Sequence, residues 1–234
     1  MAAFNNRGGG ATHPLFVFMT MSSVDDAMIA DVTGILLAGG KSRRMGKDKR
    51  FLSIGERTLL ERGLAALRKI FKHVCVVVAQ DSPPLQADVP VLHDLVPNCG
   101  SLGGVYTGLR QAETAYIFVA ACDMPFLNTD AVRYLVSLKD KADIVMAQLQ
   151  NGLQPTHAIY SRRCLPVIEE MVRTRQITLR DLAAHPSLHV RLVSEKELGA
   201  IDPEGLSFLN VNTPADLEAA RLIQASRTKH SLPP

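Results

Sequence analysis

The sequence has 234 residues, of which 47% are hydrophobic, and its 26 basic and 23 acidic side chains give a formal net charge of +3. This apolar content is enough to bury a full core, so the fold requires neither disulfides nor a structural metal. The near balance of charge argues against a general nucleic-acid or membrane surface, and any electrostatic signal must be local.

The sequence predicts a disordered leader in residues 1–30, one domain in residues 31–225 and a frayed tail in residues 226–234. The apolar run of the leader, residues 15–19, is too short to span a membrane and is poorly built for a signal peptide.

The four cysteines show neither CxxC pairing nor a histidine partner at zinc-finger spacing. A reducing cytoplasm is therefore the expected location. Cys75 and Cys122 lie in apolar runs and are expected to be small buried hydrophobic residues.

Short apolar runs through the chain predict buried strands, because their near-continuous hydrophobicity indicates that both faces of each strand are covered. These runs are residues 33–38, 74–79, 89–92, 116–121, 144–149 and 156–160. A last strand is predicted at residues 206–211.

Helical patterns lie between and after these strands. Thr58 is a predicted N-cap, with Glu61 at capping-box distance, and Thr213 followed by Pro214 marks the start of a terminal helix that ends near residue 225. The other predicted helices are residues 103–112, 129–137, 163–171 and 178–185.

This alternation predicts an α/β fold: a three-layer, doubly wound, Rossmann-like domain with a mainly parallel sheet and helices on both faces. Ligands of such sheets bind beyond the carboxyl ends of the strands. The segments that follow residues 38, 79, 92 and 121 are therefore the expected binding region.

The loop after the first strand combines Gly39-Gly40 with a local excess of positive charge. Adjacent glycines let backbone N–H groups approach a phosphate, and basic side chains neutralise its charge, so a polyphosphate site is predicted here. A P-loop pattern fails by one residue because Gly40 intervenes, and the dinucleotide fingerprint is absent. The basic residues are Lys41, Arg43, Arg44, Lys47, Lys49 and Arg50.

Further polar residues follow other strands. Asp123 follows the run 116–121 and lies two residues before Pro125. This position favours a role as a metal ligand over a simple turn cap if a triphosphate binds nearby. Asp94 reads equally well as a turn former and as a nucleotide contact. Gln154, Asn210 and Asn212 have, by themselves, ordinary turn and cap chemistry.

Residues 37–49 resemble the signature Leu-Ala-Gly-Gly-x-Ser-x-Arg-Met-Gly-x-x-Lys of the molybdenum cofactor guanylyltransferases, within the nucleotidyltransferase superfamily. Three later segments are similar to motifs of that family in the expected order. They are Cys-Asp-x-Pro at 122–125, a glycine-rich turn at 100–104 in which Ser101 replaces the usual proline, and Asn-x-Asn-x-Pro at 210–214. The resemblance extends from about residue 33 to residue 220.

The resemblance implies a nucleotidyltransferase fold and an Mg²⁺-dependent enzyme that transfers GMP from GTP to molybdenum-loaded molybdopterin. It implies a nucleotide pocket lined by Leu37, Ala38, Gly39, Gly40 and Asp94, a triphosphate grip made by Arg44 and Lys49, and Mg²⁺ bound by Asp123. It also implies that Gln154, Asn210 and Asn212 face the pterin substrate, whereas His157 reads better as a core-edge histidine. Molybdenum-insertion proteins and acceptor oxidoreductases are the implied partners, with no role for nucleic acid or membrane.

Three alternatives remain open at the level of sequence. Two share the fold: a cytidylyltransferase acting on the same cofactor and a sugar-phosphate nucleotidyltransferase. The third is a non-catalytic module that carries nucleotide or cofactor. Gly39-Gly40 favours guanine, because the related cytidylyl enzymes typically have Leu-Ala-Ala-Gly at this place.

Overall fold

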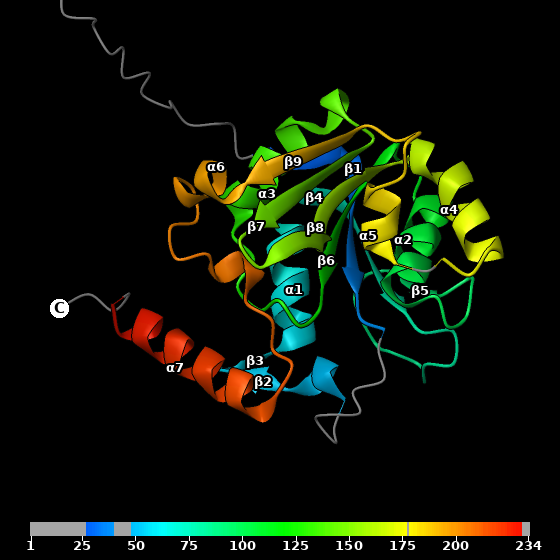
Figure 1. Cartoon of the computed structure of the whole chain (residues 1–234). Coiled ribbons are helices and arrows are strands. Elements are labelled where there is room, and N and C mark those ends of the chain that lie inside the picture. The colour runs from blue at the N-terminus through cyan, green and yellow to red at the C-terminus, as the bar shows by residue number, and fades with distance from the viewer. Residues whose placement is uncertain (1–26, 40–47, 177, 231–234) are drawn as a thin grey trace, which may run out of the picture.

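The computed structural model describes residues 27–39, 48–176 and 178–230. A seven-stranded sheet in the order β5-β4-β1-β6-β8-β7-β9 crosses the molecule (Figure 1). Its strands are β1 (Ile29–Leu37), β4 (Phe71–Val78), β5 (Val91–His93), β6 (Tyr116–Ala121), β7 (Ile144–Leu149), β8 (Gly152–Ser161) and β9 (Val190–Ser194). A two-stranded hairpin, β2 (Ser53–Ile54) with β3 (Arg57–Thr58), lies apart from this sheet.

The sheet is mixed but mainly parallel. Strands β5, β4, β1 and β6 are parallel neighbours, β8 is antiparallel to both β6 and β7, and β7 is parallel to β9. The carboxyl ends of β1, β4 and β6 therefore meet at one edge, as the predicted doubly wound arrangement requires.

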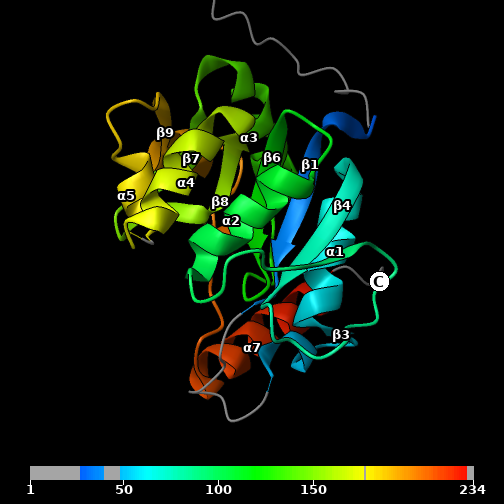
Figure 2. The same cartoon turned by 90° about the vertical axis from the view of Figure 1, so that its right-hand side faces the viewer.

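Helices cover both faces of the sheet, which confirms the predicted three layers (Figures 1 and 2). One apolar cluster packs α1 (Leu59–Arg68), α3 (Thr129–Ser137), α6 (Glu195–Gly199) and α7 (Pro214–His230) on one side. The other cluster packs α2 (Gly100–Gln111), α4 (Leu165–Arg173) and α5 (Leu179–Ala183) on the opposite side. Neighbouring residues Ile35 and Leu36 of β1 belong to different clusters, because successive side chains of a strand point to opposite faces.

Short 3₁₀ turns complete the fold: η1 (Lys49–Phe51), η2 (Lys139–Lys141), η3 (Arg162–Cys164) and η4 (Leu206–Phe208). The predicted capping box of α1 is confirmed, since the Thr58 hydroxyl accepts from the Glu61 N–H and the Glu61 carboxylate accepts from the Thr58 N–H. In the described residues, no helix is both long and apolar enough to cross a membrane.

The predicted strand at residues 206–211 is wrong. The segment begins with the 3₁₀ turn η4, which follows Gly205 in the left-handed region at φ 62°, and then runs on without strand pairing. The Val211 N–H donates to the main-chain oxygen of Asp123 at 2.9 Å, so this segment crosses the end of β6 instead of lengthening the sheet.

Two predicted boundaries also differ from the structure. Strand β1 begins at Ile29, inside the range assigned to the leader, because the Ile29 N–H donates to the main-chain oxygen of Ile70. Helix α7 continues to His230, where the sequence predicts a frayed tail, since no helix-breaking residue occurs before Pro233. Residues 1–26 and 231–234 of the predicted leader and tail lie outside the described residues.

The cysteines follow their prediction in part. All four are free thiols, and Cys122 is buried, where burial raises its thiol pKa to about 12. Cys75 is only half-buried, and it packs against the apolar cluster on the side of the sheet covered by α2, α4 and α5.

Candidate active site

The carboxyl ends of β1 and β6 open into a cavity of about 280 Å³. Register pairing puts Leu37 of β1 beside Ala121 of β6, so the segments that leave these strands start side by side. The described lining consists of Leu37, Ala38, Gly39, Asp48, Lys49, Arg50, Ser101, Ala121, Cys122, Asp123, Thr156 and Asn210. The structure therefore brings together residues from four of the sequence motifs.

Lys49 joins two of these motifs directly. Its Nζ donates to Oδ1 of Asn212 at 2.8 Å and lies 3.6 Å from Oδ2 of Asp123. Lys49 lies in η1, Asp123 follows β6 and Asn212 precedes α7, so three distant segments converge on one ammonium group. This arrangement places a cation between a carboxylate and an amide at the ligand-binding edge of the sheet.

The Asp123 carboxylate has one oxygen without a partner. Its Oδ1 is buried and accepts no hydrogen bond among the described residues. Burial raises the pKa of Asp123, while the nearby charge of Lys49 lowers it. A buried acceptor without a partner is costly, so this oxygen is suited to a ligand that the protein alone does not supply.

Mg²⁺ fits this carboxylate. The ion prefers oxygen ligands and keeps several waters while it bridges substrate phosphates, so one or two carboxylates are enough. The described ranges contain no group of three or more His, Cys, Asp or Glu residues that could hold a metal ion. A site formed by Asp123 together with phosphate oxygens and water agrees with both observations.

Arg50 fixes the segment that carries Lys49. Its guanidinium forms a forked ion pair with the Asp48 carboxylate, and its Nη1 donates to Oγ of Ser82 at 3.0 Å. Hydrogen bonds from Arg50 lower the pKa of Asp48, and the same pair raises the pKa of Arg50. The charge of Arg50 is thus compensated locally, which leaves Lys49 as the cation of η1 that contacts Asp123.

A second cavity, of about 380 Å³, adjoins the first and shares Leu37, Gly39 and Ser101 with it. Asp94 lines this neighbouring cavity, and its Oδ1 accepts from the Thr107 hydroxyl at 3.0 Å. Burial raises the pKa of Asp94, and the bond from Thr107 lowers it. Together the two cavities form a continuous path along the strand ends that is large enough for a nucleotide.

Gly39 allows a close approach between the segments that follow β1 and β4. A Cβ atom on Gly39 would lie 3.0 Å from the backbone nitrogen of Ala79, so the backbone would have to shift by a few tenths of an ångström to accept it. The absence of a side chain therefore favours this close approach.

The other predicted site residues divide into three groups. Asn210 lines the first cavity, and its Nδ2 donates to the main-chain oxygen of Phe208 at 3.2 Å. Gln154 is absent from the described lining of both cavities, because its amide is engaged by Asn151 and by the Gly152 carbonyl in the β7–β8 turn. Gly40 and Arg44 lie outside the described residues.

His157 belongs to the core, as the sequence favoured. It is fully buried between Phe118 and Phe208, with ring centroids 5.4 and 4.6 Å away, and neither ring nitrogen has a hydrogen-bond partner among the described residues. Burial lowers the pKa of His157 to about 4, so the imidazole is neutral near neutral pH.

Sequence reasoning missed Thr156 as part of the site, and it placed Arg50 in the anion-binding cluster without predicting its ion pair with Asp48. The signal for Arg50 was its position two residues after Asp48, the spacing at which the carboxylate also accepts from the Arg50 N–H. Thr156 lies in β8 beyond the residue that pairs with Ala120, a placement that only the antiparallel register of β6 and β8 reveals.

Comparison with known proteins identifies relatives over most of the chain. The family model described as a MobA-like NTP transferase domain matches residues 34–190. A probable molybdenum cofactor guanylyltransferase of Pelotomaculum thermopropionicum is 36% identical over 197 residues, covering 84% of this chain and 95% of that protein. The molybdenum cofactor guanylyltransferase of Desulfosudis oleivorans is 37% identical over 199 residues, covering 84% of this chain and 98% of that protein.

Solved structures agree on the fold. Molybdopterin-guanine dinucleotide biosynthesis protein A from Archaeoglobus fulgidus superposes with a TM-score of 0.73 at 24% identity, covering 83% of this chain and 100% of that chain. The 2-C-methyl-D-erythritol 4-phosphate cytidylyltransferase of Thermus thermophilus gives 0.60 at 17% identity, covering 83% and 99%. At these identities the two structures support the shared architecture alone, and they confirm the predicted fold class.

Proposed function

This chain belongs to the MobA-like NTP transferase family, and we propose that it transfers GMP from GTP to molybdenum-loaded molybdopterin with release of pyrophosphate. Two relatives named molybdenum cofactor guanylyltransferase, each aligned over 84% of this chain, support this assignment. The Gly39-Gly40 pair supports guanine over cytosine.

The observation that carries the proposal is the convergence of Lys49, Asp123 and Asn212 at one edge of the sheet. Lys49 belongs to the motif expected to bind the triphosphate, and Asn212 belongs to the motif expected to contact the pterin. Their hydrogen bond of 2.8 Å means that the regions proposed for the two substrates meet at a shared contact. A group-transfer enzyme requires this proximity of donor and acceptor.

Asp123 is the residue we assign to Mg²⁺, because its buried Oδ1 has no partner within the described structure. When bound, the ion supplies Lewis-acid stabilisation of negative charge on the α-phosphate. The remaining ligands in this proposal are water and phosphate oxygens, in keeping with the preference of Mg²⁺ for few protein carboxylates.

In the proposed reaction, an oxygen of the molybdopterin phosphate attacks the α-phosphorus of GTP, and the bond to the bridging oxygen of the β-phosphate breaks. The work of the protein is positioning and charge neutralisation, without a covalent intermediate on a side chain. Lys49, together with Arg44, neutralises the departing pyrophosphate. Gly39 and Asp94 position the nucleotide, and Asn210 and Asn212 orient the pterin.

The test is the rate of pyrophosphate release with GTP and, separately, with CTP, each with Mg²⁺ and molybdenum-loaded molybdopterin. GTP-selective release that falls by at least a hundredfold in Asp123→Asn supports the proposal, because the substitution removes the charge that Mg²⁺ requires. Asp130→Asn is the matched control, since Asp130 is an exposed residue in the first turn of α3.

Other outcomes identify the alternatives. A preference for CTP would establish the cytidylyl activity on the same cofactor, and release that requires a sugar phosphate in place of molybdopterin would establish a sugar-phosphate transferase. Binding of GTP without pyrophosphate release would leave a carrier of nucleotide or cofactor. Equal losses in Asp123→Asn and Asp130→Asn would remove Asp123 from the proposed site.

A further inference from the structure

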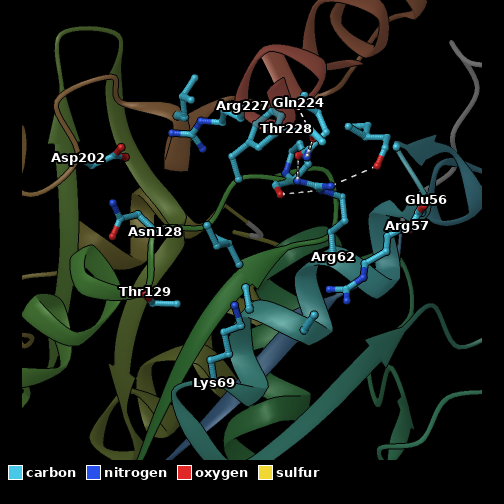
Figure 3. Close-up of a pocket in the computed structure, with 18 residues that line it drawn as sticks. Glu56, Arg57, Arg62, Lys69, Asn128, Thr129, Asp202, Gln224, Arg227 and Thr228 are labelled. Atoms are coloured by element: carbon cyan, nitrogen blue, oxygen red, sulfur yellow. Dashed lines mark hydrogen bonds between the residues drawn. The ribbon is translucent and has the colours of Figure 1, made fainter. Parts of the chain in front are cut away.

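A cavity of about 720 Å³ lies between α1 and α7, on the far side of the turn that carries Asp123. We call it the inter-helix pocket. Its walls are residues 54–57 of the hairpin, the outer face of α1, residues 125–129, the segment at Asp202 and Leu206, and the second half of α7 (Figure 3). Within the described residues, it shares no lining residue with either cavity at the strand ends.

Arg62 is the central cation of this pocket. Its guanidinium donates to the main-chain oxygens of Pro125 and Ile54, at 3.1 and 3.2 Å, and to Oε1 of Gln224 at 2.7 Å. Every one of these acceptors is neutral. A half-buried guanidinium held by neutral acceptors keeps its full positive charge, and such a charge is stabilised when an anion binds beside it.

Arg227 approaches the same space from α7. The Cζ atoms of Arg62 and Arg227 lie 5.2 and 6.0 Å from the centroid of the Phe126 ring, a distance typical of cation–π contact. Figure 3 shows Arg62 extending from α1 toward Gln224, with Arg227 and Thr228 lining the same side of the pocket. Phe126 is therefore a shared contact of one guanidinium from α1 and one from α7.

Two more cations border the pocket. Arg57 lies in the hairpin and Lys69 is the C-cap of α1 (Figure 3). Burial is the main cause that lowers the pKa of Arg62, and the positive charges of Arg57 and Arg227 lower it further. Arg62 is therefore in a locally positive environment.

The acids around the pocket only partly offset these cations. Asp202 is buried and accepts from the Ser207 N–H, while Glu56 is exposed. Glu204 Oε2 lies 3.6 Å from Nη2 of Arg227, but both side chains are largely exposed, so this ion pair is weak and open to exchange for another anion.

We propose that the inter-helix pocket binds a phosphorylated small molecule, whose phosphate lies between Arg62, Arg57 and Arg227. Guanidinium groups match phosphate oxygens through paired N–H donors, and three such groups with Lys69 outnumber the acids that line the pocket. The volume lies in the range of pockets that hold ligands of nucleotide size, well above the space that an inorganic ion fills.

This site is independent of the proposed transferase function, because it uses none of the residues assigned to GTP, Mg²⁺ or the pterin. A link to that site is the Pro125 carbonyl, which accepts from Arg62 two residues after Asp123. The ligand can therefore be sought by binding alone, and its absence would leave the guanylyltransferase proposal untouched.

The test measures binding of inorganic pyrophosphate and of ADP by calorimetry, without Mg²⁺, in a Lys49→Met background that weakens anion binding at the catalytic edge. The pocket variant is Arg57→Gln combined with Arg227→Gln, two exposed residues. The matched control is Arg110→Gln combined with Arg173→Gln, which removes the same charge from α2 and α4 on the opposite face of the sheet.

The expected result is at least tenfold weaker binding of both probes in the pocket variant and no change in the control. Thermal melts check that each variant is folded. The single variant Arg57→Gln, which breaks no hydrogen bond made by the Arg57 side chain in the described structure, is expected to weaken binding about threefold and provides a test if the double variant is unstable.

Three results would overturn the proposal. These are no binding of pyrophosphate, ADP or a hexaglutamate peptide, equal weakening in the pocket variant and the control, and binding of hexaglutamate through the same arginines where pyrophosphate and ADP do not bind. The last result would assign the pocket to an acidic protein segment.

Discussion

Replacing Lys49 by methionine tests the proposed centre of the site, because the change removes the ammonium group and keeps most of the apolar stem. Lys49 Nζ donates to Asn212 at 2.8 Å and lies 3.6 Å from Asp123 Oδ2. In the proposed reaction the same group also neutralises the departing pyrophosphate. The variant should therefore lose far more activity than stability.

The two magnitudes follow from these contacts. Loss of one charge-stabilising donor in a reacting site typically lowers kcat by about 10²–10³, which corresponds to about 2.7–4 kcal/mol. An exposed ion pair contributes about 0–1 kcal/mol to the free energy of unfolding. The side chains of Lys49 and Asp123 are 20% and 25% exposed. With the hydrogen bond to Asn212, the expected loss in free energy of unfolding is about 1 kcal/mol.

Pyrophosphate release with GTP measures the first quantity and urea denaturation measures the second. Lys196→Met is the control, since Lys196 is exposed in α6, which follows the edge strand β9, and it lines neither cavity at the strand ends. A folded Lys49→Met enzyme with kcat within about threefold of the parent would refute the role of Lys49. A loss of activity matched by an equal loss in Lys196→Met would refute it as well.

Two further predictions concern the core and the glycine loop. Burial lowers the pKa of His157 from 6.5 to about 4, so the unfolded chain binds a proton in this interval that the folded chain does not. The free energy of unfolding should therefore fall by about 3 kcal/mol as the pH drops from 6.5 to 4. Urea titrations of His157→Leu at several pH values should lack this part of the loss. A pH dependence equal to that of the parent would contradict the assignment. Gly39→Ala should cost about 1–3 kcal/mol of stability and weaken GTP binding, because the new Cβ would lie 3.0 Å from the Ala79 nitrogen. A thermal melt and a nucleotide titration measure these effects, and values equal to those of the parent would show that the backbone can move.

The elements with strong local signals were predictable from sequence. Strands β6 and β7 and helix α3 have the predicted bounds, and Thr58 caps α1 with the predicted capping box. Hydrophobic period and cap chemistry act within a few residues, so they are visible in the sequence. The strand predicted at residues 206–211 failed because apolar content alone does not distinguish a paired strand from a segment that packs across a strand end.

The site was predictable in part for the same reason. Asp123 follows a strand end whose position is predicted by the parallel pattern, whereas Lys49 was assigned through the family motif, and the structure places their side chains 3.6 Å apart. The hydrogen bonds of the Gln154 amide within the β7–β8 turn depend on the pairing of these two strands. The Asn151-Gly152 pair between two apolar runs is a hairpin signal that the prediction of the sheet did not include, and β7 and β8 form an antiparallel hairpin within the mainly parallel sheet.

The sequence by itself determined the alternation of strands and helices, the glycine-rich anion loop and the carboxylate after β6, because each depends on neighbouring residues. Tertiary structure alone decided that Lys49 lies between Asp123 and Asn212, and that Arg62 of α1 and Arg227 of α7 share one pocket. Those contacts depend on the order and register of strands and on how α7 packs against the hairpin. They join residues far apart in the chain, and only the packing of the whole core sets their distances.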